Sequence, residues 1–290
     1  TLAWSPDGRW LASGAYDRSV RVWDVNGKPA TAALQATLGG YNYKLYSVLF
    51  APDGQTLHTA QADKVTRSWN LAAWDAKGAR ELALEPDGKT DLTKPTVVSV
   101  DPSWVHATAF SPDGRLLACG YGQHQPDRSV VGHVEIRDVA SGRVVTELLG
   151  HKNFVHSLAF NSDGSRLLTG GWDGELRTWN VATGEQLTRT PAHDTPILAV
   201  AFSPDGKQLA VGGYHEVTLW NPLNGELLRR LQRRPQRIHS LDWTSDGTGV
   251  LVGGGTPGEY GELALVTAET GRVRRLFGTF DDVVLGAATS

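Results

Sequence analysis

One four-residue turn recurs along the chain and limits its possible folds more than any other feature. Its form is Ser-Pro-Asp-Gly or a close variant, and the aspartates of its six copies are Asp7, Asp53, Asp113, Asp163, Asp205 and Asp246. Proline fixes φ, the aspartate bonds to nearby backbone and glycine accepts a positive φ, so each copy predicts a sharp reversal between two strands. Successive aspartates lie 46, 60, 50, 42 and 41 residues apart. This period is typical of a four-stranded antiparallel blade.

The segments beside these turns are predicted to be strands. Residues 154–160 and 197–202 are short, rich in β-forming residues and bounded by turn residues. No window sustains the periodicity of an amphipathic helix. We therefore predict an all-β fold in which residues 1–290 form a single domain, a ring of six recognisable blades that are numbered below in chain order.

Composition narrows the class of protein. Of the 290 residues, 40% are hydrophobic and 20% are charged, which suits a large core and argues against disorder. The single cysteine, Cys119, cannot form a disulfide within the chain. No apolar run approaches the roughly 18 residues of a membrane span, and Thr1 opens directly into patterned sequence, so we expect a soluble, cytoplasmic protein. The net charge of −3 argues against general nucleic-acid binding.

The repeat resembles the WD-repeat family of β-propellers, and the resemblance covers nearly the whole chain. Its clearest copy lies in residues 150–180. In the family a buried, hydrogen-bonded tetrad locks a blade, and the resemblance assigns that role here to His151, Thr169, Asp173 and Trp179. The four-residue and six-residue spacings of the last three recur in two partial sets: Ser13, Asp17 and Trp23, and Thr59, Asp63 and Trp69.

The recurrence bears on function, because a hydroxyl, a carboxylate and a histidine together resemble a hydrolase triad. A set that returns at fixed spacing beside tryptophan is more often structural than catalytic. The sequence also lacks a Gly-x-Ser-x-Gly elbow, a phosphate-binding loop and a His-Glu-x-x-His helix. We therefore predict that the protein is not an enzyme and needs no cofactor or metal.

Several blades depart from the tetrad pattern. The departures are Tyr41 for the histidine of blade 2, Ala118 and Arg137 for the hydroxyl and tryptophan of blade 3, Val211 for the hydroxyl of blade 5, which keeps His193 and Trp220, and Val266 for the tryptophan of blade 6. We expect core packing and strand ladders, rather than a tetrad, to hold these blades.

Closure of the ring and two insertions are less regular. Residues 283–290 look like the inner strand of a further blade, and residues 1–4 like the tail of another. Either the C-terminal segment completes blade 1 and closes a six-bladed ring, or a seventh blade is absent from this chain; the family resemblance favours seven blades in the intact parent. Insertions are predicted at residues 71–91, on the bottom face of blade 2, and at residues 120–132, a polar loop on the top face of blade 3.

Two recurring positions are candidates for binding a partner. The residue before the structural aspartate, or its equivalent, is a large aromatic in three blades, and the start of the inner strand carries histidine or tyrosine in four: Tyr16, Trp172 and Tyr214, and Tyr46, His106, His156 and His239. Exposed aromatics are typical anchors of protein interfaces. The leading hypothesis is a non-catalytic scaffold, a domain or subunit of a larger assembly, that binds a protein partner through the top face of the ring.

Two alternatives remain open. Three histidines at the channel mouth would suit a metal or ligand site of an enzyme or enzyme subunit. The arginines of residues 229–237, with Arg230 and Arg234 on one strand face, would suit an acidic protein segment, phosphate or nucleic acid. A solvated outer strand is the plainer explanation of these arginines.

Overall fold

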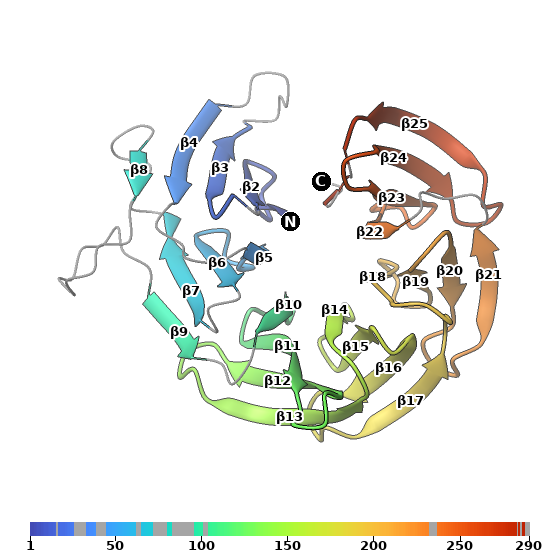
Figure 1. Cartoon of the computed structure of the whole chain (residues 1–290). Coiled ribbons are helices and arrows are strands. Elements are labelled where there is room, and N and C mark those ends of the chain that lie inside the picture. Colours follow the sequence, from blue (N-terminus) through green and yellow to red (C-terminus); the bar gives the residue numbers. More distant parts are fainter. Residues whose placement is uncertain are drawn as a thin grey trace.

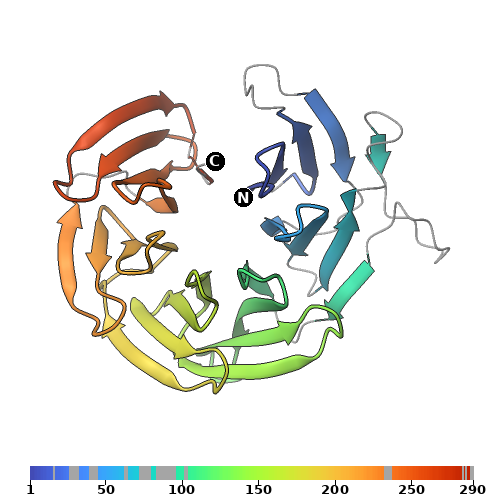
Figure 2. The same cartoon turned by 180° about the vertical axis from the view of Figure 1, so that it is seen from behind.

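The Ser-Pro-Asp-Gly-like turns close hairpins, as predicted. In all six copies the glycine has a φ between 66° and 73° and donates its N–H to the carbonyl of the first turn residue. The computed structural model describes residues 1–15, 17–25, 33–38, 45–61, 65–71, 80–82, 96–100, 104–231, 237–282, 284 and 286–287. Their strands form six blades around a central axis (Figure 1, and from behind in Figure 2), which confirms the all-β propeller. The described elements include no helix that is long and apolar enough to span a membrane.

Each blade runs from an inner strand beside the axis to an outer strand. Blades 1 to 3 consist of β1 (Leu2–Trp4), β2 (Trp10–Gly14), β3 (Val20–Asp24) and β4 (Ala33–Leu38); β5 (Leu45–Phe50), β6 (Thr56–Gln61), β7 (Val65–Asn70) and β9 (Thr96–Val100); and β10 (Val105–Phe110), β11 (Leu116–His124), β12 (Val130–Asp138) and β13 (Val144–His151). Blades 4 to 6 consist of β14 (Val155–Phe160), β15 (Arg166–Gly171), β16 (Glu175–Asn180) and β17 (Gln186–Pro191); β18 (Ala199–Phe202), β19 (Leu209–Gly212), β20 (Val217–Trp220) and β21 (Leu227–Leu231); and β22 (Ile238–Trp243), β23 (Gly249–Thr256), β24 (Tyr260–Thr267) and β25 (Val273–Phe280).

The hydrophobic core lies between the blades. Because side chains alternate along a strand, each blade presents one apolar face to the blade before it and one to the blade after it. Leu167 and Trp179 of blade 4 pack with Ile136 of blade 3. On the other side of the same sheet, Leu168 packs with Leu209 of blade 5. Each blade therefore depends on its neighbours for the burial of its apolar side chains.

The two ends of the ring meet differently from the other neighbours. Each inner strand packs on the next from β1 to β22, but within the described residues β22 makes no comparable contact with β1, and Figure 1 shows the two blades standing apart. Instead, the Ala287 N–H donates to Ser240 Oγ at 2.9 Å. The same bond, also 2.9 Å, joins Val200 to Ser157 between blades 5 and 4. β1 is the inner strand of blade 1, and the described residues of the segment 283–290, which are 284 and 286–287, form no strand of that blade. Seven blades in a parent chain stay a prediction.

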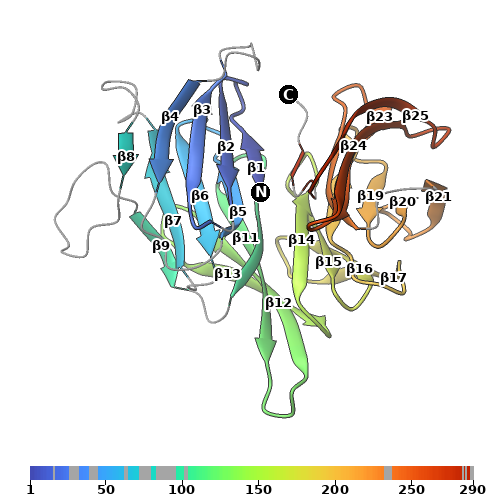
Figure 3. The same cartoon turned by 45° about the horizontal axis from the view of Figure 1, so that its top comes forward.

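The two predicted insertions take different forms. Most of residues 71–91 lie outside the described part, but β8 (Arg80–Leu82) pairs in parallel with β4 and adds a fifth strand to blade 1. Residues 120–132 are not the expected loop, because they prolong β11 and β12 into a hairpin paired as far as His124 and Val130. Figure 3 shows this hairpin extending beyond the other blades.

A complete tetrad is present in blade 4. The Trp179 indole donates to Thr169 Oγ1 at 3.0 Å, and the same hydroxyl lies 2.7 Å from His151 Nε2. The other imidazole nitrogen lies 3.0 Å from Asp173, which also accepts from the Lys152 N–H. Burial alone would raise the pKa of Asp173, but the hydrogen bonds from His151 and the backbone outweigh it and lower that pKa. The network thus satisfies a charged group inside the ring.

Blades 1 and 2 are described only in part at this position. In blade 2 the Trp69 indole donates to Thr59 Oγ1 at 3.2 Å, while Asp63 lies outside the described residues, as does Tyr41. In blade 1, Ser13 and Trp23 occupy the same register positions as Thr169 and Trp179 in blade 4, and Asp17 accepts from Ser19 and pairs with Arg21.

Blades 3 and 5 replace the tetrad with other buried polar networks, which corrects the expectation that packing and ladders alone hold them. In blade 5 the hydroxyl has moved to the neighbouring strand: Thr218, paired with Val211, lies 2.8 Å from His193 Nε2 and accepts from the Trp220 indole at 2.7 Å. In blade 3, where Arg137 stands at the tryptophan position, Arg137 and Tyr121 both donate to Glu135.

This relocation can be tested with Thr218→Val, which keeps the volume and removes the hydroxyl. The His193 nitrogen and the Trp220 indole would lose their partner inside the ring, so we expect the free energy of unfolding in urea to fall by roughly 2–4 kcal/mol. Thr218→Ser should stay close to the parent. Adding Val211→Thr to Thr218→Val, which restores a hydroxyl where blade 4 has one, should recover part of the loss; a Thr218→Val variant as stable as the parent would contradict this role.

Candidate functional site

Most of the predicted partner-binding residues meet at one cavity of about 330 Å³ where the central channel opens on the top face. The residues lining it are Thr1, Leu45, Tyr46, His106, His156, Trp172, Leu198, Tyr214, Arg237 and His239. Six of the nine predicted residues are among them. Of the other three, Tyr16 and Arg234 lie outside the described residues, and Arg230 lies elsewhere, on the outer strand β21.

A β-bulge directs four of these side chains toward the channel. The register of the inner hairpin shifts at Tyr46 in β5, His106 in β10, His156 in β14 and His239 in β22. A bulged residue has no partner in the strand ladder, and bulges commonly turn a side chain into a site. Trp172 lies just past β15, in the loop that leads to β16, and reaches the same mouth. The site is therefore built from equivalent positions of successive blades.

Aromatic rings form a continuous row along one side of the mouth. Tyr46 lies 5.2 Å from His106, centroid to centroid, and His106 lies 4.7 Å from Phe154. Phe154 also lies 5.5 Å from Trp172, whose ring stacks on His156 at 5.8 Å. Trp172 remains 42% exposed, so the row presents a large aromatic surface to solvent. The sequence analysis did not single out Phe154, although it directly precedes β14.

The opposite side of the mouth carries a cation. Arg237 pairs with Tyr214 in an isolated β-bridge, and its guanidinium lies 5.2 Å from the centre of the Tyr214 ring. The described residues that line the cavity include no carboxylate. Arg230, which the sequence analysis favoured over Arg237, instead forms an ion pair with Glu216 at 2.5 Å.

The imidazoles at the mouth are neutral near pH 7. Burial lowers the pKa of His106 and of His239 to about 4 and also lowers the pKa of His156, and the proximity of the histidines to one another adds to the effect for His106 and His239. Both ring nitrogens of His106 and Nε2 of His239 are buried and have no hydrogen-bond partner within the part of the chain that the structure describes.

The histidines do not form a compact metal-binding set. Among the described residues, the one group of His, Cys, Asp and Glu side chains whose ligand atoms lie within 4.8 Å of one another is His151, Asp173 and Glu175. Two of these belong to the tetrad of blade 4, and the third pairs with Arg177 and Arg189. The geometry therefore gives the metal-site alternative no support at the channel mouth.

Comparison with known proteins agrees with this architecture. The family model "WD domain, G-beta repeat" matches residues 1–24, 142–180 and 184–221. The chain contains WD40 repeats and folds as a β-propeller. It is 32% identical over 182 residues to a guanine nucleotide-binding protein subunit beta of Oryza sativa subsp. japonica, a match that covers 60% of this chain and 41% of that protein. It is 29% identical over 171 residues to WD repeat-containing protein VIP3 of Arabidopsis thaliana, covering 59% and 48% respectively. The matches thus span less than half of these WD40 relatives.

The aromatic row can be tested by a substitution in the β11–β12 hairpin, which packs against Phe154. A Cβ on Gly122 would overlap the Phe154 ring, so Gly122→Ala should displace Phe154 from His106 and Trp172. We expect shifted His106 and His156 ring resonances in NMR spectra and a loss of about 1–3 kcal/mol in stability. Gly278→Ala in β25, where a Cβ would make ordinary contact with Phe280, is the matched control. Unchanged histidine resonances in the Gly122 variant would refute the role given to Phe154.

The lowered histidine pKa values also predict a pH dependence. The folded chain keeps His106 and His239 neutral down to about pH 4, whereas the unfolded chain binds protons from about pH 6.5 downward. Stability from these groups is therefore complete above pH 6.5 and is lost as the pH falls toward 4. Urea midpoints at pH 7, 5.5 and 4 would measure the loss, and His106→Leu, which copies Leu198 of blade 5, should make the pH dependence shallower.

Proposed function

We propose that this WD40 chain is a non-catalytic scaffold that binds a protein partner by receiving one of its side chains in the channel-mouth cavity. The observation that carries the proposal is the convergence of four bulged inner-strand residues and two loop aromatics on that one cavity. Exposed aromatics around a small cavity are the usual anchors of protein interfaces. The name of the rice relative, which describes a subunit, supports membership of an assembly.

The chemistry of the cavity indicates what it would receive. A space of about 330 Å³ suits one or two side chains rather than a folded domain. Its walls are aromatic and imidazole rings together with the Arg237 guanidinium, and no carboxylate is present in the described part of the lining. An aromatic or aliphatic side chain followed by an acidic residue would match both sides of the mouth, since guanidinium groups bind carboxylates well.

The alternatives are less well supported. Thr169 of the triad-like set is fully buried and already bonded to an indole, so it has no access to a substrate. Arg230, the described member of the favoured arginine pair, is neutralised by Glu216. A phosphate-binding surface would give an affinity that falls steeply with salt, which the following measurement can detect.

The proposal predicts that Trp172→Ala and Arg237→Gln each weaken binding of the native partner, recovered by affinity capture from the source and measured by calorimetry, by ten- to one-hundredfold. Leu223→Ala, at an exposed site on the opposite face, should bind like the parent. Equal affinities for all three variants would overturn the proposal. So would a loss of affinity confined to Arg229→Gln and Arg230→Gln and accompanied by a steep salt dependence.

A further inference from the structure

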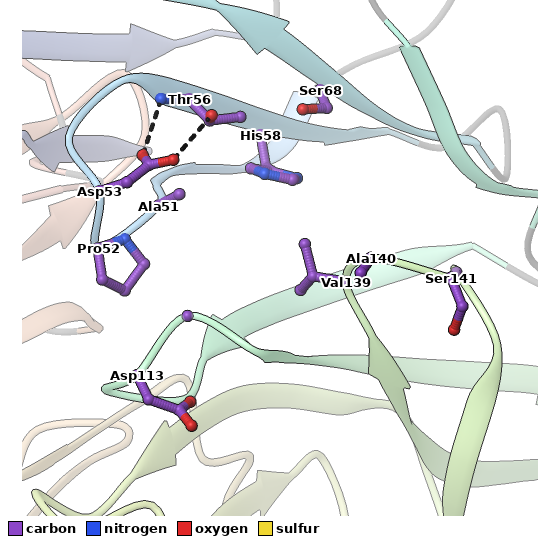
Figure 4. Close-up of a pocket in the computed structure, with 12 residues that line it drawn as sticks. Ala51, Pro52, Asp53, Thr56, His58, Ser68, Asp113, Val139, Ala140 and Ser141 are labelled. Carbon is purple, nitrogen blue, oxygen red and sulfur yellow. Dashed lines mark hydrogen bonds between the residues drawn. The ribbon is translucent and has the colours of Figure 1, made fainter.

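The geometry points to a second binding site, independent of the proposed function: a groove between blades 2 and 3 on the bottom face that receives a lysine or arginine side chain of a protein segment. The groove has a volume of about 500 Å³ and is bounded by the turns that carry Asp53 and Asp113 and by the turn after β12, with His58 and Ser68 in its wall (Figure 4). These turns lie at the opposite ends of the strands from the channel mouth.

Blade 2 places polar side chains in the wall of this groove, at a position where blades 4 and 6 carry leucine. His58 of β6 pairs with Ser68 of β7 on the sheet face that meets blade 3. The same register position holds Leu168 in blade 4 and Leu251 in blade 6. Leu168 packs against blade 5 and helps to fill the space between the two sheets. The replacement of an aliphatic side chain by His58 gives the wall of this groove a polar group that blade packing does not require.

His58 is held in a state in which it can accept a hydrogen bond from a bound group. The residue is only 4% exposed, and its ring meets Phe110 edge-on at 4.7 Å. Its Nδ1 has no hydrogen-bond partner among the described residues. Burial lowers the pKa of His58 to about 4, so the ring is neutral near pH 7 and one of its nitrogens can accept a hydrogen bond. Figure 4 shows His58 on the side of β6 that faces Val139 and Ala140. An unpaired buried polar atom is costly, and a bound donor would offset that cost.

The charge of the groove selects a cation. Asp53 and Asp113 lie at its edge, and hydrogen bonds from the Ser111 hydroxyl and the Arg115 backbone lower the pKa of Asp113, which keeps it ionised. Among the described residues that line it there is no lysine or arginine. Arg115, 3.8 Å from Asp113, is directed to solvent and does not line the groove. Three comparable grooves between blades on this face each include an arginine: Arg9, Arg229 and Arg166.

A basic side chain fits these features together. Its charged head would lie between the two carboxylates and donate to His58 and Ser68, while its aliphatic stem would run along Val139, Ala140 and the Pro52 ring. Lysine and arginine supply three and five donors respectively and no acceptor, which matches a site that offers acceptors.

The test uses the full chain and a fluorescent glycine-serine hexapeptide carrying two arginines, with a lysine version and a citrulline version of the same length. We expect saturable binding of the two cationic peptides, at least tenfold weaker binding of the neutral citrulline peptide, and a shift of the His58 ring resonances on binding. Trp172→Ala, which alters only the channel mouth, should leave all three results unchanged, so failure here and failure of the proposed function are distinguishable.

Substitutions in the groove test which of its residues bind the cationic side chain. His58→Leu copies Leu168 of blade 4, so it should fold and should weaken the arginine peptide at least tenfold; Ser68→Thr, which copies Thr178, should narrow the groove and weaken binding less. Asp113→Asn should weaken binding, whereas Asp205→Asn, in the equivalent turn beside Arg166, is the matched control. Absence of saturable binding, equal binding by His58→Leu, or an equal effect of the two asparagine variants would each overturn the proposal.

Discussion

Mutual burial of neighbouring blades is the constraint on which this structure depends. A blade with a neighbour on each side, such as blade 4, has two apolar faces, and each face is covered by one of the two neighbouring sheets. Polar side chains with unused hydrogen-bonding capacity are therefore confined to three places: the channel, the loops at the strand ends and the rare breaks in an apolar face. The channel-mouth cavity occupies the first two, and His58, in the groove between blades 2 and 3, occupies the third.

The same constraint explains why buried polar networks vary between blades. A tetrad such as that of blade 4 is needed only to satisfy the polar groups that a blade contains, so its members need not stay at fixed positions. In blade 5 the hydroxyl crosses from Val211 to the paired residue Thr218, and the imidazole and the indole still reach it. In blade 3 a glutamate serves an arginine and a tyrosine.

Much of the fold was predictable because its signals are local. The turn motif and the spacing from Thr169 to Trp179 both lie within one hairpin, where sequence separation fixes geometry. The role of Thr218 was not predictable, since two residues that face each other across a ladder have no fixed separation along the chain. The β11–β12 hairpin was not predictable for the same reason. Its glycines allow close contact with the next blade, and that contact is not visible in the sequence.

The candidate site was predictable to the extent that blades repeat. Position within the repeat was enough to select His106, His156 and His239, but not Arg237 or Phe154, which come from irregular connections between blades. The bulges have a wider consequence. A bulged side chain takes no part in the ladder that joins its strand to the next, so its identity can change at little expense to the blade, and the ring already carries tyrosine at one such position and histidine at three. Specificity for a new ligand can therefore evolve one blade at a time while the architecture stays the same.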